Sequence, residues 1–182
     1  MIDLRAMKGL RVDPGARRVR VEPGCRWVAV DHATPAFGLA TVRGFIANTG
    51  VGGLADGGGH GYLTRRHGLT IDNLTAADVV LADGRLVHAD EHEHADLFWA
   101  LRGGGGSFGV VTSFEFALHP VHTVIGGPLF SPLEDLERVL AWYRSWQPEA
   151  PDGVYAFFLI GAVPPEDHFP EEWHGRTVCG LQ

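Results

Sequence analysis

The sequence is poor in the features that define several other classes of protein. It has two cysteines, Cys25 and Cys179, which are too few and too far apart for a disulfide framework or a zinc site. We therefore interpret each as a small apolar side chain and expect no metal. The formal net charge is −7, which argues against a nucleic-acid partner because such partners require a basic surface.

Long apolar runs are missing as well. No stretch approaches the roughly 20 residues that a membrane-spanning helix needs. The first residues run directly into a polar alternation, which does not resemble a signal peptide. We therefore expect no membrane partner and a cytoplasmic protein. Hydrophobic residues still make up 45% of the 182 residues, which is typical of soluble globular proteins with one domain and part of another.

Glycine is what the sequence has in abundance, and it is concentrated in residues 44–73, where nine of thirty residues are glycine. A flexible linker would carry Ser, Pro or charge between its glycines. Here the intervening residues are Val, Leu, Ile, Phe and Tyr, which favour burial. Consecutive glycine N–H groups can line a concavity that holds phosphate oxygens or a ring carbonyl. Two interpretations stay open: loops that contact a large cofactor, or tight turns that pack against a sheet.

The glycines at 57–61 do not predict a dinucleotide-binding loop, because that motif must open a helix and residues 62–69 lack helical periodicity.

Apolar periodicity predicts a mixed α+β chain. We predict two hairpins, three helices and several further strands. Their predicted ranges are 1–12 with 18–22 and 77–89 for the hairpins, 27–34, 96–102 and 132–146 for the helices, and 108–118, 124–130, 154–160 and 177–182 for the strands.

The pattern of residue types along the sequence changes near residue 122, so we predict one domain at 1–121 and the start of another at 122–182. The last strand-like run is cut short by the end of the sequence. We therefore expect the chain to be part of a longer protein.

Several motifs together resemble the FAD-linked oxidases of the berberine-bridge-enzyme type. That family belongs to the vanillyl-alcohol-oxidase and p-cresol-methylhydroxylase superfamily. The resemblance covers about residues 1–180, and its longest motif is Asp-Leu-Phe-Trp-Ala-Leu-Arg-Gly-Gly-Gly-Gly-Ser-Phe-Gly-Val-Val-Thr at 96–112. The other motifs are Gly-Val-Gly-Gly-Leu at 50–54, Gly-Gly-Gly at 57–59, Arg-His-Gly-Leu at 66–69, Asp-Asn-Leu at 72–74 and Ala-Asp-Gly at 82–84.

The resemblance implies an FAD-binding domain of the p-cresol-methylhydroxylase (PCMH) type, followed by a substrate domain with an antiparallel sheet. It also implies oxidation of a small-molecule substrate at a C–H bond, with O₂ as electron acceptor. The residues that it places at the flavin are Asn48, Thr49, Gly50, Val51, Gly52, Gly53, Leu54, Gly58, Gly59, Gly61, Tyr62, Leu63, Asp72, Asn73, Gly109, Val110 and Val111.

The chain also departs from the family pattern. The histidine-bearing loop that clasps the pyrophosphate has no counterpart here, and Ile46 stands where bicovalent members have a cysteine. We therefore expect non-covalent FAD. Asp56 replaces a residue that is usually apolar, which places a carboxylate beside the glycines unless it turns outward. The family's catalytic base has no match, so no catalytic residue is named. The alternative is a non-catalytic chain without flavin.

Some residues allow a second interpretation. Asp72 and Asn73 could contact the cofactor or form an Asx turn. Trp99 is expected in the core, on the buried face of a short helix. His60 is expected to be a hydrogen-bonded structural histidine, and Tyr62 is either a ring contact or a packed aromatic. The acidic and histidine residues at 90–94 are interpreted as a solvated loop rather than a metal site.

Overall fold

The computed structural model describes residues 2–182. The chain divides between Thr123 and Val124 into two compact units. The predicted boundary near residue 122 lies close to this division. Each unit has its own sheet, and each is described separately below.

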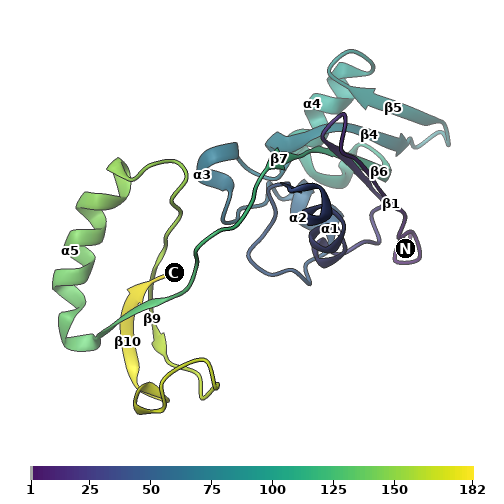
Figure 1. Ribbon diagram of the computed structural model, residues 1–182. Coiled ribbons are helices and arrows are strands. Elements are labelled where there is room, and N and C mark those ends of the chain that lie inside the picture. Colours follow the sequence, from purple (N-terminus) through teal and green to yellow (C-terminus); the bar gives the residue numbers. More distant parts are fainter. Residues whose placement is uncertain (1) are drawn as a thin grey trace. The chain divides into compact units, whose positions relative to one another are not determined.

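A five-stranded antiparallel sheet forms the framework of the first unit (Figure 1). Both predicted hairpins are present in it: β1 pairs with β2, and β4 pairs with β5. The second hairpin turns at Gly84, where a φ of 86° favours glycine. The strands, in their order across the sheet, are β1 (Leu10–Asp13), β2 (Arg18–Val21), β6 (Val110–Ala117), β4 (Leu74–Val80) and β5 (Leu86–Asp90).

One face of this sheet carries the core of the unit. Inward-facing residues such as Val21, Val79 and Phe116 share one apolar cluster with buried residues of three helices. The helices that contribute are α1 (Trp27–Ala33), α2 (Val51–Asp56) and α4 (Ala95–Gly104). Trp27 is fully buried and lies 5.3 Å from Phe116 between ring centroids. Burial of this face is the main source of stability for the unit.

Several shorter elements also belong to the first unit. The strand β3 (Leu39–Ala40) pairs with β7 (His119–Pro120). The chain that follows β6 therefore lies beside the residues that follow α1. The others are α3 (Thr64–His67) and the 3₁₀ turns at Pro35–Phe37, Ile71–Asn73 and Gly105–Ser107.

The helix α2 was not predicted, because two of its six residues are glycine and helix propensity alone disfavours it. Val51 and Ala55 lie four residues apart, on one helical face, and both are fully buried. Tertiary packing of this face therefore outweighs the propensity of the glycines. The adjacent one-turn helix α3 also falls in a segment that we interpreted as irregular.

The prediction that Trp99 belongs to the core is wrong. Its side chain is 79% exposed, whereas Phe98 and Leu101 of the same helix are buried. Successive residues of a helix are rotated by about 100°, so Phe98 and Trp99 cannot both face the core. The run Leu-Phe-Trp-Ala-Leu lacks polar residues that would mark its outer face, and this is why periodicity selected the wrong aromatic residue.

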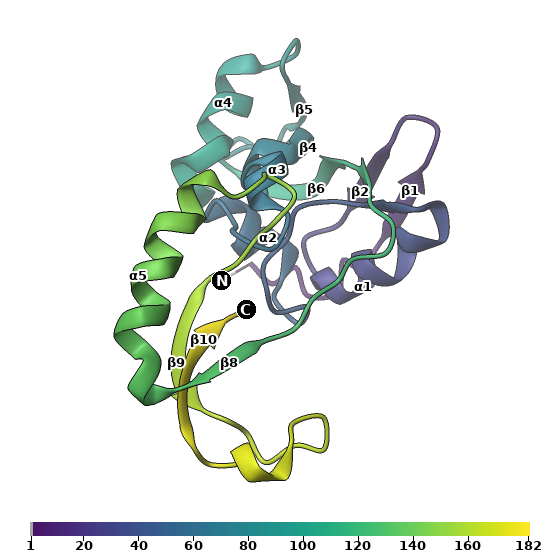
Figure 2. The same cartoon turned by 60° about the vertical axis from the view of Figure 1, so that its left-hand side comes forward.

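The second unit is a three-stranded antiparallel sheet, in the order β8-β10-β9, with one helix (Figure 2). The elements are β8 (Leu129–Pro132), α5 (Leu136–Trp146), β9 (Phe158–Ala162) and β10 (Thr177–Leu181), with 3₁₀ turns at Leu133–Asp135, Gln147–Glu149 and Glu171–Trp173. The strands and the helix are shorter than predicted, and 124–128 is not a strand. Tyr143 of α5 donates a hydrogen bond to the Ala156 carbonyl oxygen at 3.1 Å, which fixes the helix beside the sheet.

Candidate functional site: a cavity lined by two glycine segments

A cavity of about 550 Å³ lies in the first unit, where the two glycine-rich segments of the chain converge. Its volume lies within the range of small-molecule and cofactor sites. Helix α2 forms one wall and the start of β6 forms another. The residues that line it are Ile2, Asp3, Leu4, Arg5, Pro23, Gly24, Cys25, Arg26, Gly50, Gly52, Gly53, Asp56, Gly106, Gly109, Val110, Val111 and Phe114.

Backbone pairing holds the α2 wall in place. Arg26 and Gly50 form an isolated antiparallel bridge. On either side of it, the Val51 N–H donates to the Cys25 carbonyl at 3.0 Å, and the Trp27 N–H donates to the Thr49 carbonyl at 3.0 Å. The segment before α1 and the segment that opens α2 are therefore joined, and the glycines of α2 are held at the cavity by a fixed backbone.

Three glycines leave room in this wall. A Cβ atom built on Gly50, Gly53 or Gly106 would meet no other atom within 4 Å. All three glycines line the cavity, so a side chain added to any of them would lie in open space at its wall. Gly52 is tighter, because a Cβ there would lie 3.6 Å from the Phe114 ring. A bare backbone in a cavity allows a ligand to approach the peptide groups closely, which fits a cofactor that carries phosphates and a flat ring.

The charged groups of the cavity are only partly paired. Asp3 and Arg5 form an ion pair at 2.6 Å on the surface of the N-terminal segment, and this contact lowers the pKa of the Asp3 carboxyl. Arg26 is exposed. Asp56, at the end of α2, is half-buried, and burial raises the pKa of its carboxyl above the ordinary value. Burial also raises the pKa of the Cys25 thiol.

The cavity brings together six of the predicted cofactor residues. Gly50, Gly52 and Gly53 come from α2 and the residue before it, and Gly109, Val110 and Val111 come from the start of β6. These two groups are more than fifty residues apart in sequence. Gly109 also has a packing role, because its φ is 156° and a Cβ there would lie 2.6 Å from the Val79 side chain.

Gly58, Gly59 and Gly61 lie outside the cavity lining and serve the packing of the chain. The carbonyl groups of Gly58 and Gly59 accept hydrogen bonds from Ile71 and Thr70, both at 2.9 Å. A Cβ on Gly59 would lie 2.3 Å from the Thr70 hydroxyl oxygen. On Gly61 it would lie 1.7 Å from the Arg43 carbonyl oxygen. Gly58 and Gly59 also have φ values of 94° and 73°, which disfavour other residues.

The other predicted residues near α2 are also placed away from the cavity lining. Val51 is fully buried in the core. Leu54 is partly buried and packs against that core. The Thr49 hydroxyl donates to the Ile46 carbonyl at 2.8 Å, next to the exposed Asn48.

Leu63 and Tyr62 belong to the turn before α3. The Leu63 carbonyl accepts hydrogen bonds from the N–H groups of Arg66 and His67, the last two residues of that helix. The Tyr62 ring is 44% exposed and contacts the Phe45 ring edge-on, with 4.8 Å between centroids. His60 contacts the same phenylalanine at 5.4 Å. These rings form a small aromatic cluster.

Asp72 and Asn73 hold a turn together. The Asp72 carboxylate accepts a hydrogen bond from the Leu69 N–H at 2.8 Å. The buried Asn73 amide donates to the carbonyl oxygens of His67 and Leu69 at 2.9 and 2.7 Å, and its oxygen lies 2.6 Å from Nε2 of His119. These are structural contacts within the first unit, of the turn-forming kind that we kept as the alternative to cofactor contact, although the geometry is not that of an Asx turn.

The Asn73 contacts also bring two histidine rings together. His67 and His119 stack with 3.8 Å between centroids and 14° between planes. Burial lowers the pKa of both imidazoles, and the neighbouring positive charges lower it further. Because the Asn73 amide nitrogen donates both its hydrogens to carbonyls, its oxygen accepts, and Nε2 of His119 is the donor. The pair therefore favours neutral imidazoles.

Sequence reasoning missed several residues of the cavity wall. Arg26 was not singled out because it precedes an ordinary helix, and Phe114 was one apolar residue of a predicted strand. The N-terminal residues 2–5 carried no motif. Asp56 was singled out as a departure from the family pattern, and the structure places it in the wall rather than turned away from the glycines.

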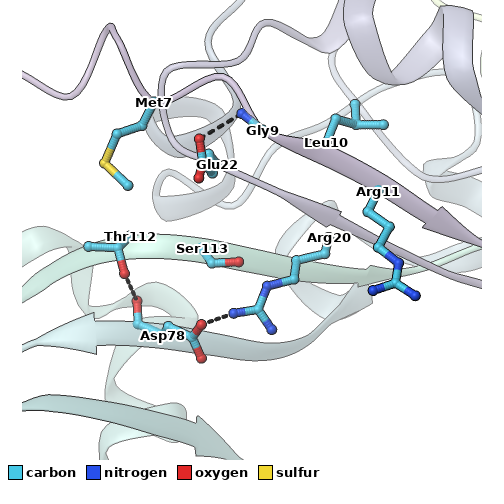
Figure 3. Close-up of a pocket in the computed structure, with 9 residues that line it drawn as sticks. All are labelled: Met7, Gly9, Leu10, Arg11, Arg20, Glu22, Asp78, Thr112 and Ser113. Atoms are coloured by element: carbon cyan, nitrogen blue, oxygen red, sulfur yellow. Dashed lines mark hydrogen bonds and ion pairs between the residues drawn. The ribbon is translucent and has the colours of Figure 1, made fainter.

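A second cavity, of about 430 Å³, lies over the opposite, polar face of the sheet (Figure 3). Glu22 accepts a hydrogen bond from the Gly9 N–H at 2.6 Å on its upper side. Across the cavity, Arg20 reaches Asp78, which also contacts Nδ1 of His88 at 2.8 Å. The principal charges are therefore satisfied by protein partners, and none of the predicted cofactor residues lines this cavity.

Within residues 2–182, no three His, Cys, Asp or Glu side chains converge as metal ligands would. At 90–94, Asp90 accepts hydrogen bonds from the His92 and Glu93 N–H groups at 2.7 and 2.6 Å, which organises the loop before α4. Across the same residues, none of the helices combines the length and apolarity that crossing a bilayer requires.

Comparison with known proteins supports a flavin site. Residues 1–90 match the family described as FAD binding domain. An FAD-linked oxidoreductase from Aspergillus terreus is 46% identical over 130 residues, which cover 71% of this chain and 26% of the relative. Glucooligosaccharide oxidase from Sarocladium strictum is 57% identical over 77 residues, which cover 42% of this chain and 15% of the relative.

Solved structures give the same result. The crystal structure of 6-hydroxy-D-nicotine oxidase from Arthrobacter nicotinovorans superposes with a TM-score of 0.82 at 30% identity, covering 98% of this chain and 38% of that one. The chain thus spans less than two fifths of the length of these relatives. The matched family and the mixed helix and antiparallel-sheet fold agree: the chain carries an FAD-binding domain of the PCMH type, and it is similar to part of the FAD-linked oxidoreductases.

Proposed function

We propose that the chain forms the FAD-binding part of an oxidoreductase and binds the flavin non-covalently. The observation that carries this proposal is the cavity in which Gly50, Gly53 and Gly106 leave bare backbone at the wall. A cofactor with a pyrophosphate and a flat ring system fits such a wall, because peptide N–H groups can approach it without interference from side chains. Val110 and Val111 add apolar surface beside them.

The residues that would hold FAD are those of the cavity wall. The backbone of Gly50 to Gly53 and of Gly106 to Val111 would supply donors, and Arg26 would supply positive charge. The bound flavin would supply the redox chemistry, while the protein binds, orients and shields it. Ile46 cannot form a thioether, and its side chain is 70% exposed. Acid precipitation should therefore release any bound flavin from the chain, and flavin that stays with the pellet would contradict non-covalent binding.

The proposed activity is oxidation of a small molecule at a C–H bond, with electrons passed to O₂. The substrate class is an alcohol, sugar, amine or alkaloid-like compound, in keeping with relatives whose names refer to glucooligosaccharide and 6-hydroxynicotine. We propose that residues 1–121 form the FAD-binding domain and 122–182 the start of the substrate domain. The separate sheet of the second unit supports this division.

The test is to incubate the purified chain with FAD, remove free flavin by gel filtration and record the visible spectrum. Flavin bands that co-elute with the protein support the proposal. A colourless protein that unfolds cooperatively, and is therefore folded, would contradict it and favour the alternative of a flavin-free chain.

A further inference from the structure

One carboxylate in the cavity wall, that of Asp56, is at odds with the proposed ligand. Asp56 is the last residue of α2 and is half-buried at the cavity, beside Gly52 and Gly53. Among residues 2–182, no hydrogen bond or ion pair is made to its side chain. Burial without a partner disfavours an ionised carboxyl, and it raises the pKa of Asp56. The pyrophosphate of FAD carries negative charge, so an ionised Asp56 opposes the same ligand that the glycines favour.

The other charges at this cavity do not neutralise Asp56. On the N-terminal segment, Arg5 is bound to Asp3 at 2.6 Å. Arg26 lies at the opposite end of the wall, where it pairs through its backbone with Gly50 at the start of α2. Apart from the Asp3–Arg5 pair, the described residues of the wall include one cation, Arg26, and one anion, Asp56, and no ion pair joins these two.

Among the residues that the structure describes, the elements packed beside Asp56 bring no positively charged group to its carboxylate. Helix α4 packs against α2, and its cation Arg102 lies 3.6 Å from Asp72. Its acid Asp96 is exposed and accepts a hydrogen bond from the N–H of Leu97. The residues of β6 that line the cavity, Val110, Val111 and Phe114, carry no charge, and Cys25 is a buried thiol whose pKa is raised.

We propose that Asp56 sets the affinity of this cavity for phosphate-bearing flavins, opposing FAD and FMN when it is ionised and admitting them when it is neutral. Arg26 acts in the opposite direction, because its positive charge attracts the phosphates. Riboflavin has the same ring and ribityl chain but no phosphate. Its affinity should therefore depend little on either residue. This inference rests on the proposed flavin site, and it names the group in that site that discriminates between flavins.

The experiment compares dissociation constants of riboflavin, FMN and FAD for the 182-residue chain and for Asp56→Asn, measured by flavin fluorescence between about pH 5 and pH 8. At the high end of this range, Asp56→Asn should bind FAD and FMN about tenfold more tightly than the natural chain, which is the factor that one pKa unit of charge interaction represents. Riboflavin should change by less than about twofold. The advantage should shrink as the pH falls, because protonation neutralises the natural carboxyl.

Three further variants make the result specific. Arg26→Gln should weaken FAD and FMN and leave riboflavin unchanged. Asp56→Ala should reproduce Asp56→Asn, so that the result does not depend on the new amide or on the folding of one variant. Asp83→Asn makes the same charge change in the β4–β5 turn, at a carboxylate paired with Arg85, and should leave all three constants unchanged. Thermal unfolding of each variant checks that it is folded.

The outcomes separate this inference from the proposed function. If the natural chain binds FAD and Asp56→Asn shows the same FAD-to-riboflavin ratio at every pH, the role of Asp56 is overturned while the flavin site stands. If the folded natural chain and Asp56→Asn both fail to bind any of the three flavins, the proposed function is contradicted, and the inference falls with it.

Discussion

Two glycine segments only a few residues apart, 50–53 and 58–61, have similar compositions but different roles. At Gly50 and Gly53, which line the cavity, the space where a side chain would lie is open. At Gly59 and Gly61, the same space is filled by Thr70 and by the Arg43 carbonyl. The first segment leaves room for a ligand, and the second allows two stretches of backbone to pack. Glycine content alone does not distinguish these roles, because they depend on what the missing Cβ would meet.

The largest expected effect concerns the packing segment. Gly61→Ala places a Cβ 1.7 Å from the Arg43 carbonyl oxygen, and backbone atoms cannot move aside as a flexible side chain can. We expect the free energy of unfolding to fall by more than about 3 kcal/mol. Urea denaturation followed by circular dichroism measures this. A midpoint equal to that of the natural chain would show that this segment is no more constrained than the cavity segment.

The Asn73 turn comes next. Asn73→Ala removes two hydrogen bonds to the carbonyls of His67 and Leu69, and it leaves Nε2 of His119 without its acceptor. Unsatisfied buried polar groups cost about 1 to 3 kcal/mol, and we expect a destabilisation of that size. Asn48→Ala is the matched control because Asn48 is exposed, and its unfolding midpoint should not change. FAD affinity that is lost in a still-folded Asn73→Ala would instead assign this residue to the cofactor.

Acid should weaken the same region by a smaller amount. The pKa values of His67 and His119 are lowered in the folded state, so the unfolded chain binds more protons below about pH 6.5. Stability should therefore fall as the pH drops from about 6.5 to 5, by about 1 kcal/mol or less. The raised pKa of Asp56 acts with the opposite sign, because its folded carboxyl holds its proton longer, so stability falls as the pH rises above the ordinary carboxyl pKa.

Variants separate these two contributions to the pH dependence. His119→Gln should lose less stability in acid than the natural chain does. Asp56→Asn should no longer show the loss of stability that the Asp56 carboxyl causes as the pH rises. The urea midpoint of each variant, measured from about pH 5 to pH 8, gives the comparison. If the urea midpoint of His119→Gln falls in acid as steeply as that of the natural chain, the stacked histidine pair is not the source of the loss of stability.

The smallest expected effect is a gain in stability. Gly53→Ala adds a methyl group that meets no other atom within 4 Å, at a helical position. Alanine is favoured over glycine within helices by about 0.5 to 1 kcal/mol, so the unfolding midpoint of the chain without flavin should rise slightly. A fall in the midpoint would mean that Gly53, like Gly61, is needed for packing.

Much of the framework could be predicted from the sequence because it depends on local patterns. Period-two alternation and the Asp-Gly turn are sufficient to identify the β1–β2 and β4–β5 hairpins. Helix α2 could not be predicted in this way, because it is held by the burial of Val51 and Ala55 rather than by propensity. The exposure of Trp99 also depends on tertiary packing, since neighbouring aromatic residues give no sign of which one faces the core.

The candidate site could be predicted only in part. The family resemblance placed the segments around Gly52 and Gly109 at the same cofactor, and the cavity includes residues from both. The assignment of Gly59, Gly61 and Asn73 to the cofactor rested on motif resemblance. The structure gives all three packing or hydrogen-bonding roles that only a three-dimensional neighbour could reveal.

The most direct test of the account is an FAD titration of Gly53→Leu, with Gly126→Leu as the matched control. Both glycines have open space where a side chain would lie, but only Gly53 lines the cavity. We expect the natural chain and Gly126→Leu to bind FAD with equal affinity, and Gly53→Leu to bind at least about tenfold more weakly, or about 1.4 kcal/mol, without losing thermal stability. Equal FAD affinity in all three proteins would contradict the assignment of this cavity to the flavin.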